Sequence, residues 1–397
     1  MSKSGRCLFF LFTERFEKIL HATEEAAGLG TVFFGRELFE LLEQFTLAHD
    51  RGSSHGRSRV TRQAYFENPA YVPLLGRANE LWSQLQRDSG KRLIEITGGL
   101  MLGPPDGGVV QGTLASARMH GLPHEVLDAP EVRRRFPAFS IEDGTVGVLD
   151  EVAGVLFPEE CIRAHAAAAT KAGATLHWQE PVVSWKATGD SVEVETAGAR
   201  YVAGTLVLCA GPWMGDLLAD LRLPLAVERN VLYWFRPTTD LTLFAPGKFP
   251  VFLIEHEPGK LFYGFPALGD DGVKVARHHT GVWCSPTDIR REIDPDEILE
   301  ARLILERHLP AVNGALLSAT TCMYTNTPDG HFVLDRHPRH PNVIVASPCS
   351  GHGFKFASVI GEVLADLVCD GRTEHPIEMF RLGRFTGTID GSGSRRR

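Results

Sequence analysis

The chain has 397 residues, of which 43% are hydrophobic, and a formal net charge of −8 at pH 7. This length exceeds what one simple core needs, so two domains or one discontinuous pair are expected. The acidic balance, with no basic stripe, argues against a nucleic-acid partner, and no apolar run approaches the ~18 residues of a membrane span.

The seven cysteines are scattered and show no CxxC spacing. An odd, dispersed set favours free thiols in a reducing compartment, and no metal site is expected. The apolar run at 7–12 is too short for the core of a signal peptide. The C-terminal residues Ser394-Arg395-Arg396-Arg397 also differ from a peroxisomal address of the Ser-Lys-Leu type.

The first 45 residues lack the glycine-rich turn that brings backbone N–H groups to a dinucleotide pyrophosphate. The run at 7–12 could be a strand, but Glu14 follows where a phosphate would lie. Gly28 and Gly30 do not complete a G-x-G-x-x-G motif, because position 33 is Phe33. These glycines are interpreted as a surface turn.

Periodicity and capping signals place the other elements. Leu38, Leu41, Leu42 and Phe45 fall at helical spacing, which by itself predicts a helix there. Further helices are predicted at 71–87, 128–136, 157–172, 295–308 and 354–370. Strands are predicted at 93–96, 100–102, 175–178, 191–196, 205–209, 230–236, 251–255, 261–265, 272–279 and 342–346.

Two stretches carry candidate site residues. The segment 51–62 is rich in glycine, serine, histidine and arginine, which suits an anionic ligand, although charge alone fits a solvated basic loop equally well. In the strand at 272–279, alternation places Lys274, Ala276 and His278 on one face. Such a face is more often a polar outer surface than a cavity wall.

The segment Cys322-Met323-Tyr324-Thr325, followed by Pro328-Asp329-Gly330, resembles the flavin-attachment segment of the monomeric sarcosine oxidase and N-methyltryptophan oxidase family. Gly351-His352-Gly353-Phe354-Lys355 extends the resemblance, which runs from about Leu42 to about Phe380. The residues in these motifs are most similar to those of the branch of peroxisomal sarcosine (L-pipecolate) oxidases. Outside that context, a lone Cys322 would usually be a small buried hydrophobic residue.

The resemblance implies an α/β fold with two discontinuous domains. An FAD-binding Rossmann-like domain, incomplete at its N-terminus, would comprise 1–90, 151–224 and 330–397. A substrate domain on a mixed β-sheet would comprise 91–150 and 225–329. FAD would be attached covalently through Cys322, and the other implied cofactor-binding residues are Glu43, Ser53, His55, Gly211, Gly351 and Gly353. In contrast to the helical spacing, the resemblance implies that residues 41–45 end a strand, where Glu43 would bind the adenosine ribose.

The resemblance also implies the reaction, the oxidation of sarcosine or L-pipecolate by O2 to an imine and H2O2. With sarcosine, the imine would hydrolyse to glycine and formaldehyde. The implied catalytic residues are Lys274, His278, Arg59 and Tyr324, and the implied substrate-binding residues are Arg62, Lys355 and Tyr263. A monomer is expected, in the peroxisome by resemblance or in the cytoplasm as the alternative.

Two departures keep other readings open. The missing glycine loop allows an inactive or FAD-poor relative, and the pocket residues equally allow an oxidase of another N-methyl amino acid. Ser347-Pro348-Cys349 stands where the family has small, flexible residues, and Pro348 removes a backbone donor.

Overall fold

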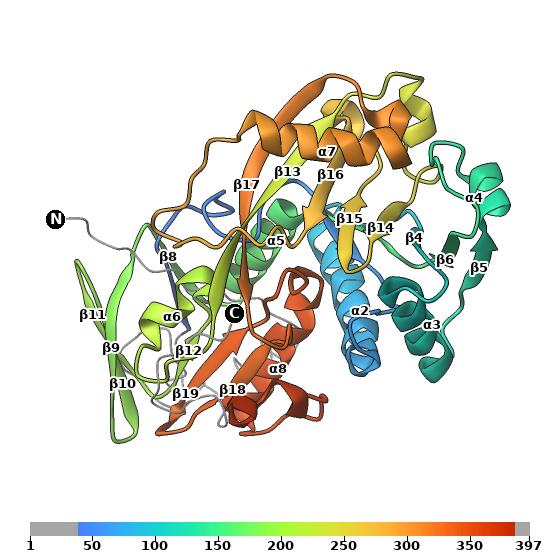
Figure 1. Ribbon diagram of the computed structural model, residues 1–397. Helices are drawn as coiled ribbons and strands as arrows, with labels where there is room; N and C mark the ends of the chain where they lie inside the picture. The colour runs from blue at the N-terminus through green and yellow to red at the C-terminus, as the bar shows by residue number, and fades with distance from the viewer. Residues whose placement is uncertain (1–38, 386–397) are drawn as a thin grey trace, which may run out of the picture.

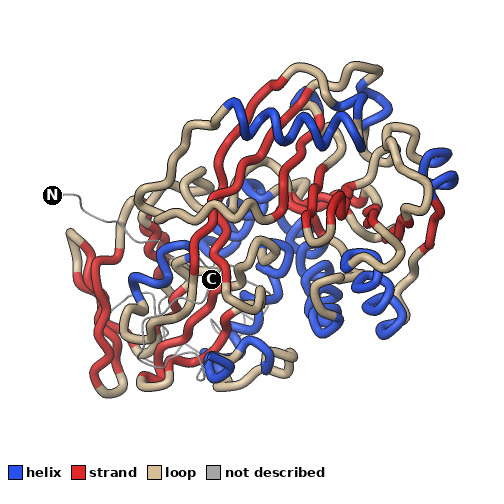
Figure 2. Tube along the Cα trace, in the orientation of Figure 1, coloured by secondary structure: helices blue, strands red, loops and turns tan. Residues whose placement is uncertain are grey.

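The computed structural model describes residues 39–385, so the predictions for the run at 7–12 and for Gly28 and Gly30 lie outside the described residues. Its largest element is an eight-stranded sheet with the order β17-β13-β16-β15-β14-β4-β6-β5 (Figures 1 and 2). The strands are β4 (Gly99–Gly103), β5 (Glu125–Asp128), β6 (Val146–Asp150), β13 (Ala226–Phe235), β14 (Val251–Glu257), β15 (Lys260–Gly264), β16 (Val273–His278) and β17 (Leu316–Asn326). β14 and β4 are parallel and the other neighbours antiparallel, which confirms the mixed sheet.

The helix α7 (Pro295–His308) lies across β13, β16 and β17 (Figure 1). It has the bounds that the sequence predicts, and it begins at a capping box formed by Asp294 and Glu297. Its buried Ala301 and Leu305 share an apolar cluster with Val273 and Val275 of β16. One face of β16 is therefore core, which leaves the opposite face for Lys274 and His278.

The remaining strands form smaller sheets. β1 (Glu40–Glu43) pairs in parallel with β8 (Thr175–Trp178), and β12 (Leu206–Leu208) pairs in parallel with β19 (His340–Ser347), which also pairs with β18 (Val333–His337). β9 (Val182–Thr188), β10 (Ser191–Thr196) and β11 (Arg200–Ala203) form an antiparallel sheet. β7 (Gly154–Leu156) lies between β2 (Arg59–Thr61) and β3 (Ile94–Ile96).

The helices near these sheets bury apolar faces in one large cluster. α2 (Val72–Ser89) contributes Leu74, Leu75 and Trp82 to it and ends at Gly90, whose φ of 65° is left-handed. α8 (Ala357–Cys369) follows a short 3-10 turn at Phe354–Phe356. The other helices are α3 (Gly108–His120), α4 (Ala129–Arg135), α5 (Pro158–Lys171) and α6 (Met214–Leu217).

The helix predicted from Leu38 to Phe45 is wrong, because Glu40–Glu43 form the strand β1. Leu41 and Leu42 are both buried, at 6% and 1% exposure, so this parallel strand has apolar residues on both faces. Such strands lack the period-two alternation that identifies a half-exposed strand. The helix α3 was not predicted; its N-cap residue, Gly107, and its first residue, Gly108, are both glycines.

The predicted domain boundaries remain a prediction. Within the described residues, none of the helices combines the length and the apolar character that a membrane crossing requires.

Candidate active site

A pocket lies between the 53–62 segment, the β13–β15–β16–β17 face of the large sheet, and the turn at 346–355 that leads into α8. Eleven of the predicted site residues line it: Ser53, Arg59, Arg62, Gly211, Tyr263, His278, Cys322, Tyr324, Gly351, Gly353 and Lys355. The tertiary structure therefore brings together residues that are spread over three hundred positions of the chain. The predicted residues that do not line it are Lys274, His55 and Glu43.

Cys322 and Tyr324 project from one face of β17, whereas Met323 between them packs into the large apolar cluster on the other face. Met323 and Thr325 also border the pocket. Cys322 is 1% exposed. The Arg59 guanidinium lies beside it, with Nη2 at 3.7 Å from the Cys322 Sγ. Arg59 is held there by the carbonyl oxygens of Ser53 and Ser58, at 2.6 and 2.8 Å.

Lys274 lies behind the lining, on the face that alternation predicts. Its Nζ donates to the carbonyl oxygens of Gly56 (2.7 Å) and Ser58 (2.8 Å), and to Ser58 Oγ (3.0 Å). Burial, with the positive charge of Arg59 nearby, lowers the pKa of Lys274 well below its ordinary value. Lys274 thus connects the sheet to the loop that carries Arg59.

The two cations predicted to bind a carboxylate, Arg62 and Lys355, both line the pocket. Arg62 donates two hydrogen bonds from Nη2 to the Glu67 carboxylate, at 2.6 and 2.7 Å, and stacks on the rings of Tyr65 and Phe66. Lys355 Nζ donates to the His352 carbonyl at 2.7 Å. Burial, together with the charge of Arg62, lowers the pKa of Lys355 to about 7.

Glu67 was not predicted from the sequence, although it lines the pocket and forms an ion pair with Arg62. The Arg62 charge holds the pKa of this carboxyl below its ordinary value, although burial alone would raise it. The only sequence signal for this ion pair is that Glu67 follows Arg62 by five residues. The stretch between them has no helical or strand periodicity that would place the two side chains together.

His352, which stabilises the turn beside Lys355, was also not predicted from the sequence. Its Nε2 lies 2.9 Å from the Gly330 carbonyl, so Nε2 carries the proton and Nδ1 accepts from the Tyr65 hydroxyl at 2.6 Å. Burial lowers the pKa of His352 to about 4, which leaves the ring neutral at pH 7. The ring fixes the turn that presents Lys355.

A second group of lining residues consists of Tyr263, Tyr324 and His278. The Tyr324 hydroxyl lies 3.4 Å from the Tyr263 hydroxyl and 3.4 Å from His278 Nδ1. Burial lowers the pKa of His278 and raises that of Tyr324, both strongly. At neutral pH these residues therefore present uncharged polar groups to the pocket.

The glycines at the turn permit close approach. A Cβ on Gly351, whose φ is 78°, would lie 2.6 Å from the Tyr324 ring. A Cβ on Gly353 would lie 1.8 Å from the Pro348 carbonyl oxygen, so Pro348 is accommodated by the adjacent glycine. Gly211, with φ of 50°, begins the short 3-10 turn after β12.

Glu43 and His55 are buried outside the lining. Glu43 ends β1 and accepts a hydrogen bond from the Phe45 N–H at 2.9 Å. His55 is 3% exposed, and burial together with the Arg59 charge lowers its pKa to about 3. Glu43 is thus the last residue of β1, and His55 belongs to the 53–62 segment.

Several buried polar atoms around the pocket have no hydrogen-bond partner within residues 39–385. They are Ser53 Oγ, His55 Nε2, Thr325 Oγ1 and Ser347 Oγ, and three of these residues line the pocket. An unmet buried polar group costs about 1–3 kcal/mol, so the site fits a ligand that carries both donors and acceptors. In the same part of the chain, no cluster of histidine, cysteine or acidic residues could hold a metal ion.

Residues 40–367 match the family model of FAD-dependent oxidoreductases (DAO). Monomeric sarcosine oxidase from Streptomyces avermitilis is 46% identical over 342 residues, which covers 85% of this chain and 89% of the relative. N-methyl-L-tryptophan oxidase from Escherichia coli strain K12 is 36% identical over 341 residues, covering 85% and 90%. Since these relatives are bacterial, they do not support the expected peroxisomal compartment.

Among solved structures, NikD, an amino acid oxidase of nikkomycin biosynthesis, superposes with a TM-score of 0.76 at 24% identity, covering 92% of this chain and 94% of the other. L-proline dehydrogenase from P. horikoshii superposes with the same TM-score at 21% identity, covering 89% and 92%. Both show the fold alone. The unpartnered polar atoms and the close-approach glycines fit FAD, whose polar atoms would meet them. The chain belongs to the family of FAD-dependent oxidoreductases that includes monomeric sarcosine oxidase and N-methyl-L-tryptophan oxidase.

Proposed function

We propose that this protein oxidises a small secondary-amine amino acid, sarcosine or L-pipecolate, with O2 to an imine and H2O2. The observation that carries this proposal is the polarity of one pocket. Arg62 and Lys355 line this pocket together with Tyr324 and the uncharged His278, and Cys322 lies in its wall. An amino acid has a carboxylate and an amine at matching positions. In this reaction sarcosine would give glycine and formaldehyde after hydrolysis of the imine.

When bound, FAD would supply the redox chemistry, which is removal of the equivalent of a hydride from the carbon beside the amine nitrogen and transfer of the electrons to O2. Cys322 would hold it covalently as a thioether. The other residues that would hold it are Glu43, Ser53, His55, Gly211, Gly351 and Gly353.

Arg62 and Lys355 would bind the substrate carboxylate through charge-assisted hydrogen bonds. Arg62 is already paired with Glu67, so a substrate carboxylate competes with this internal anion. Lys355, which is 6% exposed, offers its charge without a carboxylate partner among the described residues. Two cations at fixed positions would orient the substrate for the reaction.

His278, Tyr324 and Tyr263 would pack around the amine. Because His278 stays neutral, it does not repel a protonated amine. Arg59 and Lys274 would favour negative charge that builds up beside Cys322 during electron transfer, and Lys274 is proposed to act in the oxygen step.

The same pocket supports a second candidate, the oxidation of another N-methyl amino acid, because the N-methyl-L-tryptophan oxidase relative is 36% identical. The third reading, an inactive or FAD-poor relative, follows from the absence of a glycine loop before Glu43. A monomer in the cytoplasm completes the proposal.

The test is anaerobic mixing of FAD-loaded protein with sarcosine, L-pipecolate and N-methyl-L-tryptophan in turn. Bleaching of the flavin absorbance by sarcosine or L-pipecolate, followed by H2O2 on admission of O2, would support the proposal. Bleaching by N-methyl-L-tryptophan alone would favour the second candidate. Purified protein that takes up no FAD would favour the third, and flavin bands that none of the three bleach would refute the first two.

A further inference from the structure

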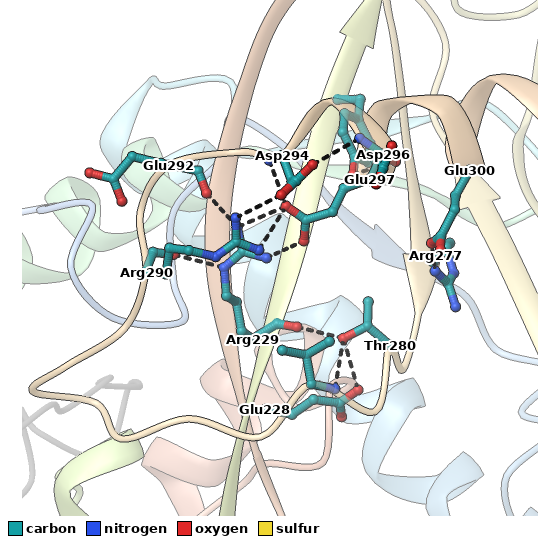
Figure 3. Close-up of polar contacts among 12 residues, drawn as sticks. Glu228, Arg229, Arg277, Thr280, Arg290, Glu292, Asp294, Asp296, Glu297 and Glu300 are labelled. Carbon is teal, nitrogen blue, oxygen red and sulfur yellow. Dashed lines mark hydrogen bonds and ion pairs between the residues drawn. The ribbon is translucent and has the colours of Figure 1, made fainter.

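The site face of β13 carries a buried carboxylate, Glu228, that the proposed reaction does not use. Glu228 lies directly opposite Tyr324 in the antiparallel β13–β17 ladder, so the two side chains project from the same face of the sheet. It is 1% exposed. The next residue, Arg229, points to the opposite face and pairs with Glu297 of α7 (Figure 3).

Glu228 holds the turn that follows His278 at the end of β16. Its Oε2 accepts from His279 Nδ1 (2.9 Å) and from Asn326 Nδ2 (2.6 Å). Its Oε1 accepts from the Gly281 N–H (2.8 Å), with the Thr280 hydroxyl at 3.4 Å. In Figure 3 Thr280 lies beside Glu228, and the Thr280 hydroxyl donates its proton to the Arg229 carbonyl oxygen at 2.6 Å.

The His279 ring, the Gly281 N–H and the Asn326 amide all donate to this carboxylate, so a side chain with two acceptor oxygens satisfies all three. Burial alone would raise the pKa of Glu228, but the hydrogen bonds from His279, Gly281 and Asn326 hold it below its ordinary value. The carboxylate is therefore ionised at neutral pH, where its hydrogen bonds are charge-assisted.

The turn that Glu228 holds is strained. His279 has a φ of 63°, a left-handed conformation that costs a residue with a Cβ about 1–2 kcal/mol. Its ring packs against His278, with centroids 4.2 Å apart, and against Tyr324 at 5.4 Å. The strain is thus sustained where it presses an imidazole against the two residues that form the amine end of the pocket.

We propose that Glu228 is a positioning residue for the amine end of the pocket, which it acts upon through His279 and the turn at 279–281. This inference rests on the function proposed above. Loss of the carboxylate would let the turn relax, and His278 and Tyr324 would lose the ring that packs behind them. Binding of the carboxylate at the Arg62 and Lys355 end would be unaffected.

The experiment compares FAD-loaded wild type with Glu228→Leu and Glu228→Gln. Glu297→Gln is the matched control, because it removes a carboxylate that pairs with the opposite face of β13. Glu228→Gln keeps the shape but turns an amide donor toward donors, so it tests the inference even where Glu228→Leu fails to fold. Hydrogen exchange of the peptide over 279–285 reports on the turn without any substrate.

In the Glu228 variants we expect faster exchange of this peptide. We also expect the limiting rate of anaerobic flavin reduction by sarcosine to fall about 10- to 100-fold, the effect of misplacing a reacting geometry by about 1 Å. Acetate affinity should stay within about twofold of wild type, as for distant sites. The double variant Glu228→Gln/His279→Leu should be no slower than the slower single variant.

Faster exchange with an unchanged reduction rate would overturn the inference, as would unchanged exchange. Additive losses in the double variant would place the action of Glu228 outside His279 and also overturn it. If Glu297→Gln lowered the limiting rate of flavin reduction as much as the Glu228 variants do, the effect would be a general weakening of β13, and the inference would be overturned. Failure of wild type to be reduced by sarcosine would count against the proposed function, and the exchange measurement would still decide whether Glu228 holds the turn.

Discussion

Raising the pH through 7 should weaken carboxylate binding to the pocket, because Lys355 loses its charge. Lys355 is 6% exposed, and burial with Arg62 nearby lowers its pKa to about 7. A pKa lowered from the ordinary value of a lysine means that the protonated form, which attracts an anion, predominates only below about pH 7. A bound carboxylate should therefore be held most tightly on the acid side of this value.

The magnitude follows from the fraction of protonated Lys355. If acetate binds only the protonated form, its apparent Kd rises as that fraction falls, by roughly 30-fold between about pH 6 and about pH 8.5. The neighbouring groups do not reverse this trend. Burial lowers the pKa of His352 to about 4, and the pKa values of His278 and Glu67 are also lowered, so their charges stay constant over the interval.

The assay is calorimetric titration of acetate into FAD-loaded protein across this pH interval. Lys355→Met should bind acetate more weakly at the acid end, by about 1–3 kcal/mol for one charge-assisted hydrogen bond, and without pH dependence. Lys274→Met is the control and should keep the wild-type slope, because Lys274 lies behind the lining. A flat wild-type profile, or the same slope in Lys355→Met, would refute the assignment.

Four further outcomes are expected. Acid-denatured wild type should retain yellow colour in the pellet while Cys322→Ser releases its flavin to the supernatant; equal retention would exclude Cys322 as the anchor. Lys274→Met should slow oxygen-dependent reoxidation far more than anaerobic reduction, and stopped-flow traces impaired only in reduction would contradict its role. Glu67→Gln should bind acetate more tightly and melt at a lower temperature without it, because Arg62 is left buried and unpaired; weaker acetate binding would show that Glu67 does not compete with the substrate carboxylate. The unmodified chain should carry substoichiometric FAD, and replacing residues 1–40 with a strand–glycine loop–helix unit should restore loading, as measured by the ratio of flavin to protein absorbance; full occupancy in the unmodified chain would refute this prediction.

The sequence alone determined the features that depend on neighbouring residues. The capping box at Asp128 and Glu131 predicted the start of α4, because capping is a contact between residues three apart. Alternation predicted that Lys274 and His278 share a face, since a strand turns its side chains by a fixed period. The motif around Cys322 predicted the family, and the comparisons confirmed it.

The tertiary structure decided what those residues contact. Lys274 meets the carbonyl of Gly56, 218 positions away, and Glu228 meets His279, 51 positions away; no local pattern encodes such pairs. The burial of Leu41 and Leu42 between layers likewise made a strand of a segment with helical spacing. The pKa of Lys355 changed for the same reason, because desolvation depends on everything packed around a charge and not on the residues beside it in the chain.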